Sequence, residues 1–203
     1  MATTAAPYGL RPVNLIGGLP YAGSTRQLKI ASGYATNIFN GSIVAIVAAG
    51  TVEVPLTPVV GSAANPLPAG TVGVFVGCTY TDPNLKYKIF SQYWPTGTVA
   101  SDAMAYVVDD DRVLFQAQSA GSLVQAELGA NVPLSAVQST NTGSTTTGNS
   151  TTALSATTAV TSGIAFRIVD FVESTTSTVG DAYTDVLVKF NPLSHSYTNP
   201  TGI

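Results

Sequence analysis

Hydrophobic and polar residues alternate in short runs along most of the chain, and Gly, Pro, Asn and Asp separate the runs. This period of two, together with many β-branched and aromatic residues, is typical of strands. Residues 42–47 (SIVAIV) are apolar throughout, as in a strand buried on both faces. The pattern predicts strands within residues 26–31, 42–47, 51–56, 71–81, 85–94, 104–108, 112–116, 164–173 and 183–191.

Two local features refine this prediction. Residues 104–108 and 112–116 flank three aspartates, so this stretch is expected to form a hairpin. Residues 120–130 (AGSLVQAELGA) show helical spacing and end near Gly129, a plausible helix stop. The predicted class is all-β, a sandwich or a jelly-roll-like barrel, with at most one or two short helices.

The first 24 residues differ from the rest of the chain. Prolines at 7, 12 and 20 and glycines at 9, 17, 18 and 23 disfavour a helix. The segment is nevertheless richer in apolar residues than a disordered tail. We therefore predict an extended N-terminal arm, residues 1–24, that packs on its own body or on a neighbour. Residues 25–203 form one β-rich domain with a Ser/Thr-rich excursion at about 129–163.

The excursion contains the stretch STNTGSTTTGNSTT, residues 139–152, which has no charge and no large apolar side chain. Such tracts are usually linkers or disorder. Leu154, Val160 and alternating threonines nearby favour a partly ordered loop or small hairpin. Three roles stay open: a surface loop without function, a contact between subunits, or a ligand site.

Charged residues make up only 9% of the 203 residues, against roughly 25% in ordinary domains. So few charges give little electrostatic protection against association, which is a first indication that the protein functions within a larger assembly. The net charge is −3 and no basic cluster exists, which argues against binding nucleic acid or a charged membrane surface. No secretion signal and no bilayer-length apolar run are visible, so we expect folding in a cytosol.

The sequence offers little catalytic chemistry. Cys78 is expected to be a buried small hydrophobe, the alternative being a catalytic thiol. His195 is the single histidine and is expected to be structural or exposed. No nucleophile–histidine set, zinc spacing or phosphate-binding glycine motif can be assembled from these residues. We therefore expect a protein that is not an enzyme and holds no cofactor.

Two clusters leave alternatives open. Asp109, Asp110 and Asp111 are expected to form a turn. The weaker alternatives are a binding site for a structural cation and the active site of a metal-dependent hydrolase. Residues 85–94 (LKYKIFSQYW) interleave lysines with aromatics. Sheet packing explains this pattern, while binding of carbohydrate, a partner or nucleic acid would be the functional alternative.

Both ends of the chain resemble a known protein family. PYGLRPVNLIGGLPYAGSTRQLKIASGYATNIFNGSIV (residues 7–44) and FRIVDFVE…GDAYTDVLVKFNPLSHSY (residues 166–197) are similar to virion structural proteins of tailed bacteriophages, in particular capsid decoration, or cement, proteins. The resemblance implies a β-rich homo-oligomer, often a trimer, that binds the major capsid protein on the outer capsid surface and is made in the host cytoplasm. It supplies no catalytic residues.

For that role, the arm is the expected partner contact, through Tyr8, Leu10, Arg11, Pro12 and Tyr21. Deleting residues 2–20 is then expected to leave a folded body that no longer binds the capsid. The alternative is a tail- or fibre-associated virion protein that binds host glycans through Tyr87, Tyr93 and Trp94.

Overall fold

The computed structural model describes residues 4–56, 59–139 and 142–203. Nearly all of its regular structure is β, as predicted. The strands of the described residues are β1 (Arg11–Leu15), β2 (Arg26–Lys29), β3 (Ile43–Ile46), β4 (Val52–Glu53), β5 (Thr71–Thr81), β6 (Lys88–Ser91), β7 (Met104–Val108), β8 (Val113–Gln118), β9 (Asn131–Val132), β10 (Phe166–Phe171) and β11 (Asp185–Phe190).

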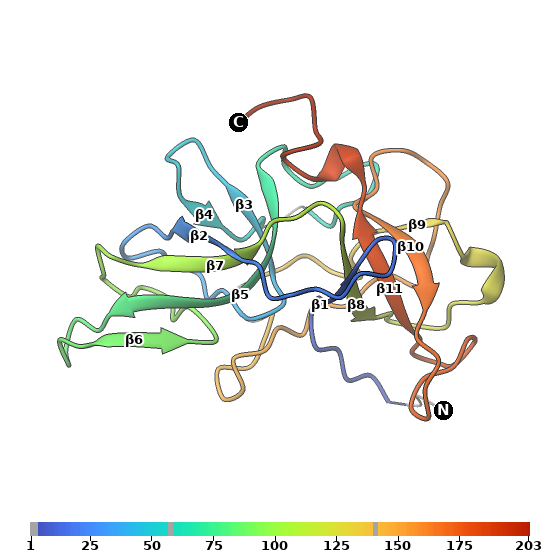
Figure 1. Ribbon diagram of the computed structural model, residues 1–203, viewed down its shortest axis with the longest axis horizontal. Helices are drawn as coiled ribbons and strands as arrows, with labels where there is room; N and C mark the ends of the chain where they lie inside the picture. Colours follow the sequence, from blue (N-terminus) through green and yellow to red (C-terminus); the bar gives the residue numbers. More distant parts are fainter. Residues whose placement is uncertain (1–3, 57–58, 140–141) are drawn as a thin grey trace.

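These strands form two antiparallel sheets, consistent with an all-β sandwich and not with a closed barrel. The five-stranded sheet has the order β1-β8-β11-β10-β9, and the six-stranded sheet has the order β2-β7-β5-β3-β4, with β6 paired to β5. Figure 1 shows the six-stranded sheet at the left of the molecule and the five-stranded sheet at the right.

Two hydrophobic clusters stabilise the fold, and β3 and β5 contribute to both. Ile43 and Val74 belong to the cluster of the five-stranded sheet, whereas Val44 and Phe75 belong to the cluster of the six-stranded sheet. All four side chains are fully buried. Both faces of these strands are shielded from water. This two-sided burial explains why each strand contains a run of apolar residues.

The predicted hairpin around the three aspartates is wrong. Residues 104–108 and 113–118 are strands, but β7 lies between β2 and β5 in one sheet, and β8 lies between β1 and β11 in the other. The aspartates therefore form the link between the sheets. Asp110 makes the local turn that the sequence indicated, since its Oδ1 accepts a 2.8 Å hydrogen bond from the Arg112 N–H. Such a turn bends the chain without fixing which strands pair.

Residues 120–130 form only a short 3-10 turn, η1 (Gln125–Glu127). Nearby backbone groups bond to a distant loop instead, because the Leu123 N–H donates to the Thr184 hydroxyl and the Leu123 carbonyl accepts from the Gly180 N–H. A second helical turn among the described residues is η2 (Pro192–Ser194). The described chain contains no helix with the length and apolar character to cross a membrane.

The N-terminal arm follows the chain's own body. Its strand β1 pairs with β8 at the edge of the five-stranded sheet, and Leu10 is 1% exposed in the core. Residues 19–21 return along the outer side of β1, where the Tyr21 N–H donates to the Val13 carbonyl. The expectation that deletion of residues 2–20 would spare the body is therefore unsafe, because that deletion removes a sheet strand and a core side chain.

Candidate functional site

The residues predicted as partner contacts have different positions in the arm. Leu10 is enclosed by the chain's own core and has almost no surface to offer a partner. Tyr8, Pro12 and Tyr21 are half-buried, and Arg11 is exposed. The guanidinium of Arg11 lies over the Tyr8 ring at 4.5 Å from its centroid, a cation–π contact that holds the cation in place.

Tyr8 also ties the arm to β11. Its hydroxyl donates a 3.1 Å hydrogen bond to the Asp185 carboxylate. Burial, and then the negative charge of Asp185, raise the pKa of Tyr8. Burial likewise raises the pKa of Asp185, against the hydrogen bond from Tyr8. The start of the arm is thus held by a polar contact as well as by the core.

The Ser/Thr-rich excursion packs beside the arm. The Asn40 N–H donates to the Gly148 carbonyl at 2.9 Å, and the Ser150 N–H donates to the Asn40 carbonyl at 2.8 Å. Ser150 and Thr152 are buried and their hydroxyls bond to each other at 2.7 Å. The stretch 139–152 is therefore ordered against the body over its described residues, while 140–141 lie outside them.

A groove of about 540 Å³ opens between the arm, the excursion and the six-stranded sheet. Six separate segments of the chain line it, so only the fold brings its walls together. Three of the predicted contact residues, Arg11, Pro12 and Tyr21, lie in this lining. The others are Gly23, Thr25, Asn40, Val76, Gln92 and Asn149.

Three of the lining residues carry side-chain amides: Asn40, Gln92 and Asn149. Sequence inspection missed all three, because isolated amides far apart in the chain give no recognisable spacing. The position of Asn149 within the Ser/Thr-rich stretch was the one available signal. The groove is the place where the arm and that stretch, the two unusual segments of the sequence, meet.

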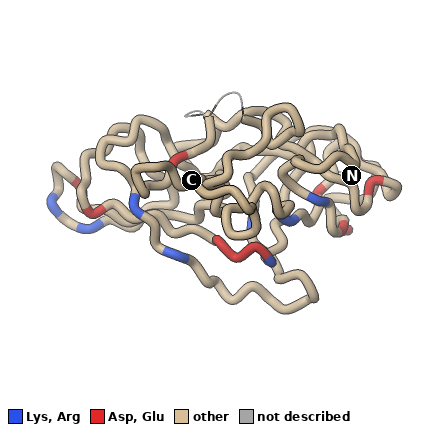
Figure 2. The backbone as a smooth tube through the Cα atoms, turned by 90° about the horizontal axis from the view of Figure 1, so that it is seen from above, with Lys and Arg blue, Asp and Glu red and all other residues tan. Residues whose placement is uncertain are grey.

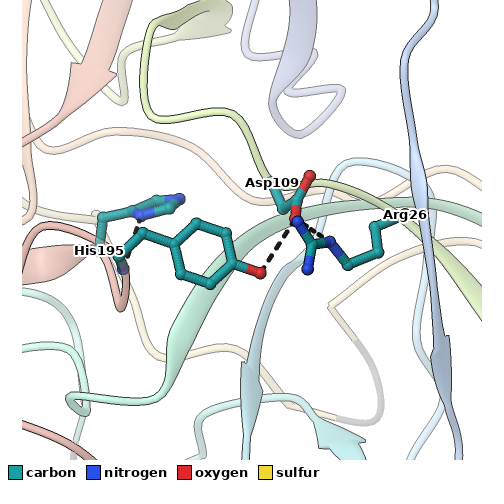
Figure 3. A network of polar contacts seen from close by, with 4 residues as sticks. Arg26, Asp109 and His195 are labelled. Atoms are coloured by element: carbon teal, nitrogen blue, oxygen red, sulfur yellow. Dashed lines mark hydrogen bonds and ion pairs between the residues drawn. The ribbon is translucent and has the colours of Figure 1, made fainter.

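The three aspartates do not act as one group. Asp109 pairs with Arg26, whose Nε lies 2.5 Å from Oδ2, and the Tyr197 hydroxyl donates to the same oxygen at 3.0 Å. Figure 3 shows Asp109 and Arg26 facing each other, with His195 nearby. No group of three His, Cys, Asp or Glu in the described residues is arranged to hold a metal ion.

His195 is buried at the end of this network, with 1% of its surface exposed. Its Nδ1 accepts a 3.3 Å hydrogen bond from the Tyr197 N–H, which places the proton of the neutral ring on Nε2. Within the described chain Nε2 has no hydrogen-bond partner. Burial lowers the pKa of His195, although the negative charges of Asp111, Asp109 and Asp110 favour its protonated form.

The aromatic residues of 85–94 do not form a shared platform. Trp94 is fully buried and donates its Nε1–H to the Tyr34 carbonyl, while Tyr93 stacks on Phe39. Of the three residues proposed to bind glycans, Tyr87 is the widely exposed one, at 56%. The glycan surface proposed for Tyr87, Tyr93 and Trp94 is therefore not formed, because the Trp94 ring is not accessible to a ligand. Cys78 is buried, as expected for a small hydrophobe.

Charged side chains are scattered over the molecule. Most of the backbone in Figure 2 is uncharged, and no long basic stretch stands out. No family model matches the chain, and neither a curated protein nor a solved structure matches it.

Proposed function

We propose that this protein is a non-enzymatic structural component of a phage virion, a capsid cement protein. It binds the major capsid protein on the outer capsid surface and associates as a homotrimer. The resemblance of residues 7–44 and 166–197 to decoration proteins motivates this assignment. The low charge content supports it, because surfaces of Ser, Thr and Asn can enter an interface without the cost of desolvating ions.

The observation that carries the proposal is the apolar tip of the arm. The Gly18 N–H donates to the Leu15 carbonyl and the Leu15 N–H donates to the Leu19 carbonyl, which closes a tight turn. The turn leaves Ile16 and Leu19 45% and 66% exposed. Neighbouring apolar side chains on a fixed turn are a common contact for another protein, whereas scattered exposed residues mean little.

A second surface favours association in the same way. Strand β6 pairs only with β5 among the described residues, so its outer edge is open. Phe90 on this strand is 72% exposed, and Leu85 just before it is 59% exposed. An open edge with exposed apolar residues can accept an extended segment of a partner chain.

The test measures occupancy on shells assembled from the major capsid protein of a tailed phage. The variant Ile16→Ser with Leu19→Ser changes only the exposed tip of the arm, unlike a deletion. Val160→Ser is the matched control, because Val160 is 95% exposed in the excursion. We expect the wild type and the control to decorate shells at fixed positions, and the double variant to lose at least about tenfold in affinity.

The mass of the free protein is measured in parallel by sedimentation. A stable trimer that decorates shells supports the proposal. The proposal is overturned if the wild-type protein does not bind shells. If the double variant binds as tightly as the wild type, the arm tip does not contact the capsid. The alternative of a fibre-associated protein would predict binding to cells or glycans without shell binding.

A further inference from the structure

The groove between the arm and the excursion carries more hydrogen-bonding capacity than the fold uses. Within the described part of the chain, no hydrogen bond involves the side-chain amide of Asn40, Gln92 or Asn149. Each amide has two N–H donors and a carbonyl acceptor. Three residues with side-chain amides therefore line one groove, and their donors and acceptors are not used by other described residues.

Some other amides of this chain are used internally. Gln138 accepts from the Ile43 N–H at 2.9 Å and donates to the Ile43 carbonyl at 3.2 Å. Asn191 donates to the Ile164 carbonyl and to Asn131. No such side-chain bond is formed by the amides around the groove within the described residues.

Backbone pairing fixes the main-chain positions of two of these residues. Asn40 and Asn149 belong to neighbouring segments that form a parallel bridge, supported by the hydrogen bonds of Asn40 to residues 148 and 150. Gly148 packs so closely on Gln92 that a Cβ at Gly148 would lie 2.8 Å from the Gln92 Cβ. A ligand would meet residues whose backbone is already held in place, so less backbone entropy is lost on binding.

Apolar surface lies between these polar groups. Tyr21, Pro12 and Val76 contribute to the lining, and Tyr21 and Val76 also pack against the hydrophobic core. The Tyr21 hydroxyl donates to the Ser24 carbonyl at 2.6 Å, which restrains the ring. A groove with fixed apolar patches and a few convergent polar groups is typical of small-ligand sites, and its volume lies in their range of about 300–1,000 Å³.

The charge of the lining restricts the class of ligand. Arg11 is the one charged residue among the lining residues, and its guanidinium is stacked on Tyr8. One cation is too little for a polyanion such as nucleic acid. Paired amides match neighbouring hydroxyls, which also donate and accept, and apolar patches match the C–H faces of a sugar ring. We infer that this groove binds a neutral oligosaccharide.

An extended peptide fits the groove less well. A peptide that adds to a sheet needs an open row of backbone groups. The outer edge of β1 beside the groove is covered by residues 19–21 of the same chain. The available groups are side-chain amides from three separate segments, which is an arrangement for hydroxyls on a compact ligand.

The experiment uses the full-length protein and an array of neutral oligosaccharides, followed by titration of the best binder. Gln92→Ala and Asn149→Ala are the test variants. Gln125→Ala is the matched control, because Gln125 is an exposed amide in η1 outside the groove. We expect a Kd of about 1 mM or tighter, a fivefold to tenfold weakening in each test variant, and no change in the control.

Nuclear magnetic resonance provides a second readout. Saturating sugar should shift the side-chain amide signals of Asn40, Gln92 and Asn149 and leave that of Gln125 in place. The inference is overturned by three results: no sugar binds, binding is unchanged in both test variants, or only an extended peptide moves the groove signals. It does not depend on shell binding, so the two proposals fail separately.

Discussion

Gly9 and Gly41 lie against each other where the arm meets the body. The Leu10 N–H donates to the Gly41 carbonyl at 3.0 Å, and a Cβ at Gly9 would lie 2.9 Å from that carbonyl oxygen and 2.9 Å from the Ser150 Cβ. Both glycines have positive φ angles, 77° and 90°. The arm, the loop before β3 and the Ser/Thr-rich excursion therefore meet at one point that has no room for a side chain.

This contact predicts a graded effect of adding a methyl group. Gly33 is the matched control, because its φ of 76° equals that of Gly9 within a degree while nothing lies within 4 Å of a Cβ there. Gly33→Ala should lower the free energy of unfolding by about 1–2 kcal/mol through backbone strain alone. Gly9→Ala should cost at least about 1 kcal/mol more, because the methyl also clashes. Urea unfolding of both variants measures the difference, and equal losses would contradict the close contact.

The second prediction concerns the pH dependence of stability. Burial lowers the pKa of His195 from its ordinary value of 6.5, so the unfolded chain binds the proton more tightly than the folded chain. The stabilising contribution is therefore complete above pH 6.5 and decreases as the pH falls through the folded-state pKa. The free energy of unfolding from urea titrations between about pH 5 and 8 should fall toward the acidic end.

The control for this pH effect is His195→Gln, which removes the only histidine of the chain. Its slope with pH over this range should be smaller than that of the wild type, whatever its absolute stability. Asp185 contributes with the opposite sign, because burial raises its pKa above 3.8 and its effect begins at lower pH. An unchanged slope in His195→Gln would assign the acid sensitivity to other groups.

The third prediction concerns the reactivity of Cys78. Burial raises the pKa of its thiol to about 12, and the side chain is 1% exposed. Thiolate is the reactive form, so a thiol reagent at neutral pH should hardly label the folded protein. Labelling should become complete and fast in denaturant. Rapid labelling of the native protein would show that the six-stranded sheet opens readily around β5.

Several parts of this structure could be predicted from the sequence because they depend on local pattern. Strand β5 has the bounds that its β-branched and aromatic residues indicated, Thr71–Thr81. The pairing of β7 and β8 was not predictable in this way. The pattern of residues 104–116 predicts a hairpin, yet β7 and β8 each pair with strands that are distant in the sequence. A turn motif is local, whereas the choice of sheet depends on which edges the rest of the chain has filled.

The residues that line the groove could likewise be predicted from the sequence only in part. Arg11, Pro12 and Tyr21 were predicted contacts because the arm has an unusual composition, and all three line the groove. Asn40, Gln92 and Asn149 are separated by about fifty residues each, and no spacing rule connects them. Their proximity follows from the bridge between the loop before β3 and the excursion. Such a site becomes visible only when the long-range pairings are known.

The last prediction concerns the link between the C-terminal segment and the two sheets. Asp109 Oδ2 accepts from both Arg26 and Tyr197, and Arg26 also lies over the Tyr197 ring at 5.3 Å. Tyr197→Phe removes one donor and should lower the free energy of unfolding by about 1 kcal/mol. The Arg26–Asp109 coupling should stay below about 1 kcal/mol and weaken with salt, because the Arg26 side chain is 58% exposed.

A double-mutant cycle on Arg26 and Asp109 measures this coupling, and the pair Arg112–Asp110 is the internal control. That control pair is longer, at 3.5 Å, and its side chains are 67% and 34% exposed, so its coupling should be smaller. Repeating the cycle in Tyr197→Phe should change the Arg26–Asp109 coupling, since both donors share one carboxylate oxygen. If the two pairs show equal coupling and Tyr197→Phe is neutral, the network does not fasten the C-terminal segment. Burial of His195 and the hydrogen bond from the Ser196 N–H to the Thr71 carbonyl would then hold it alone.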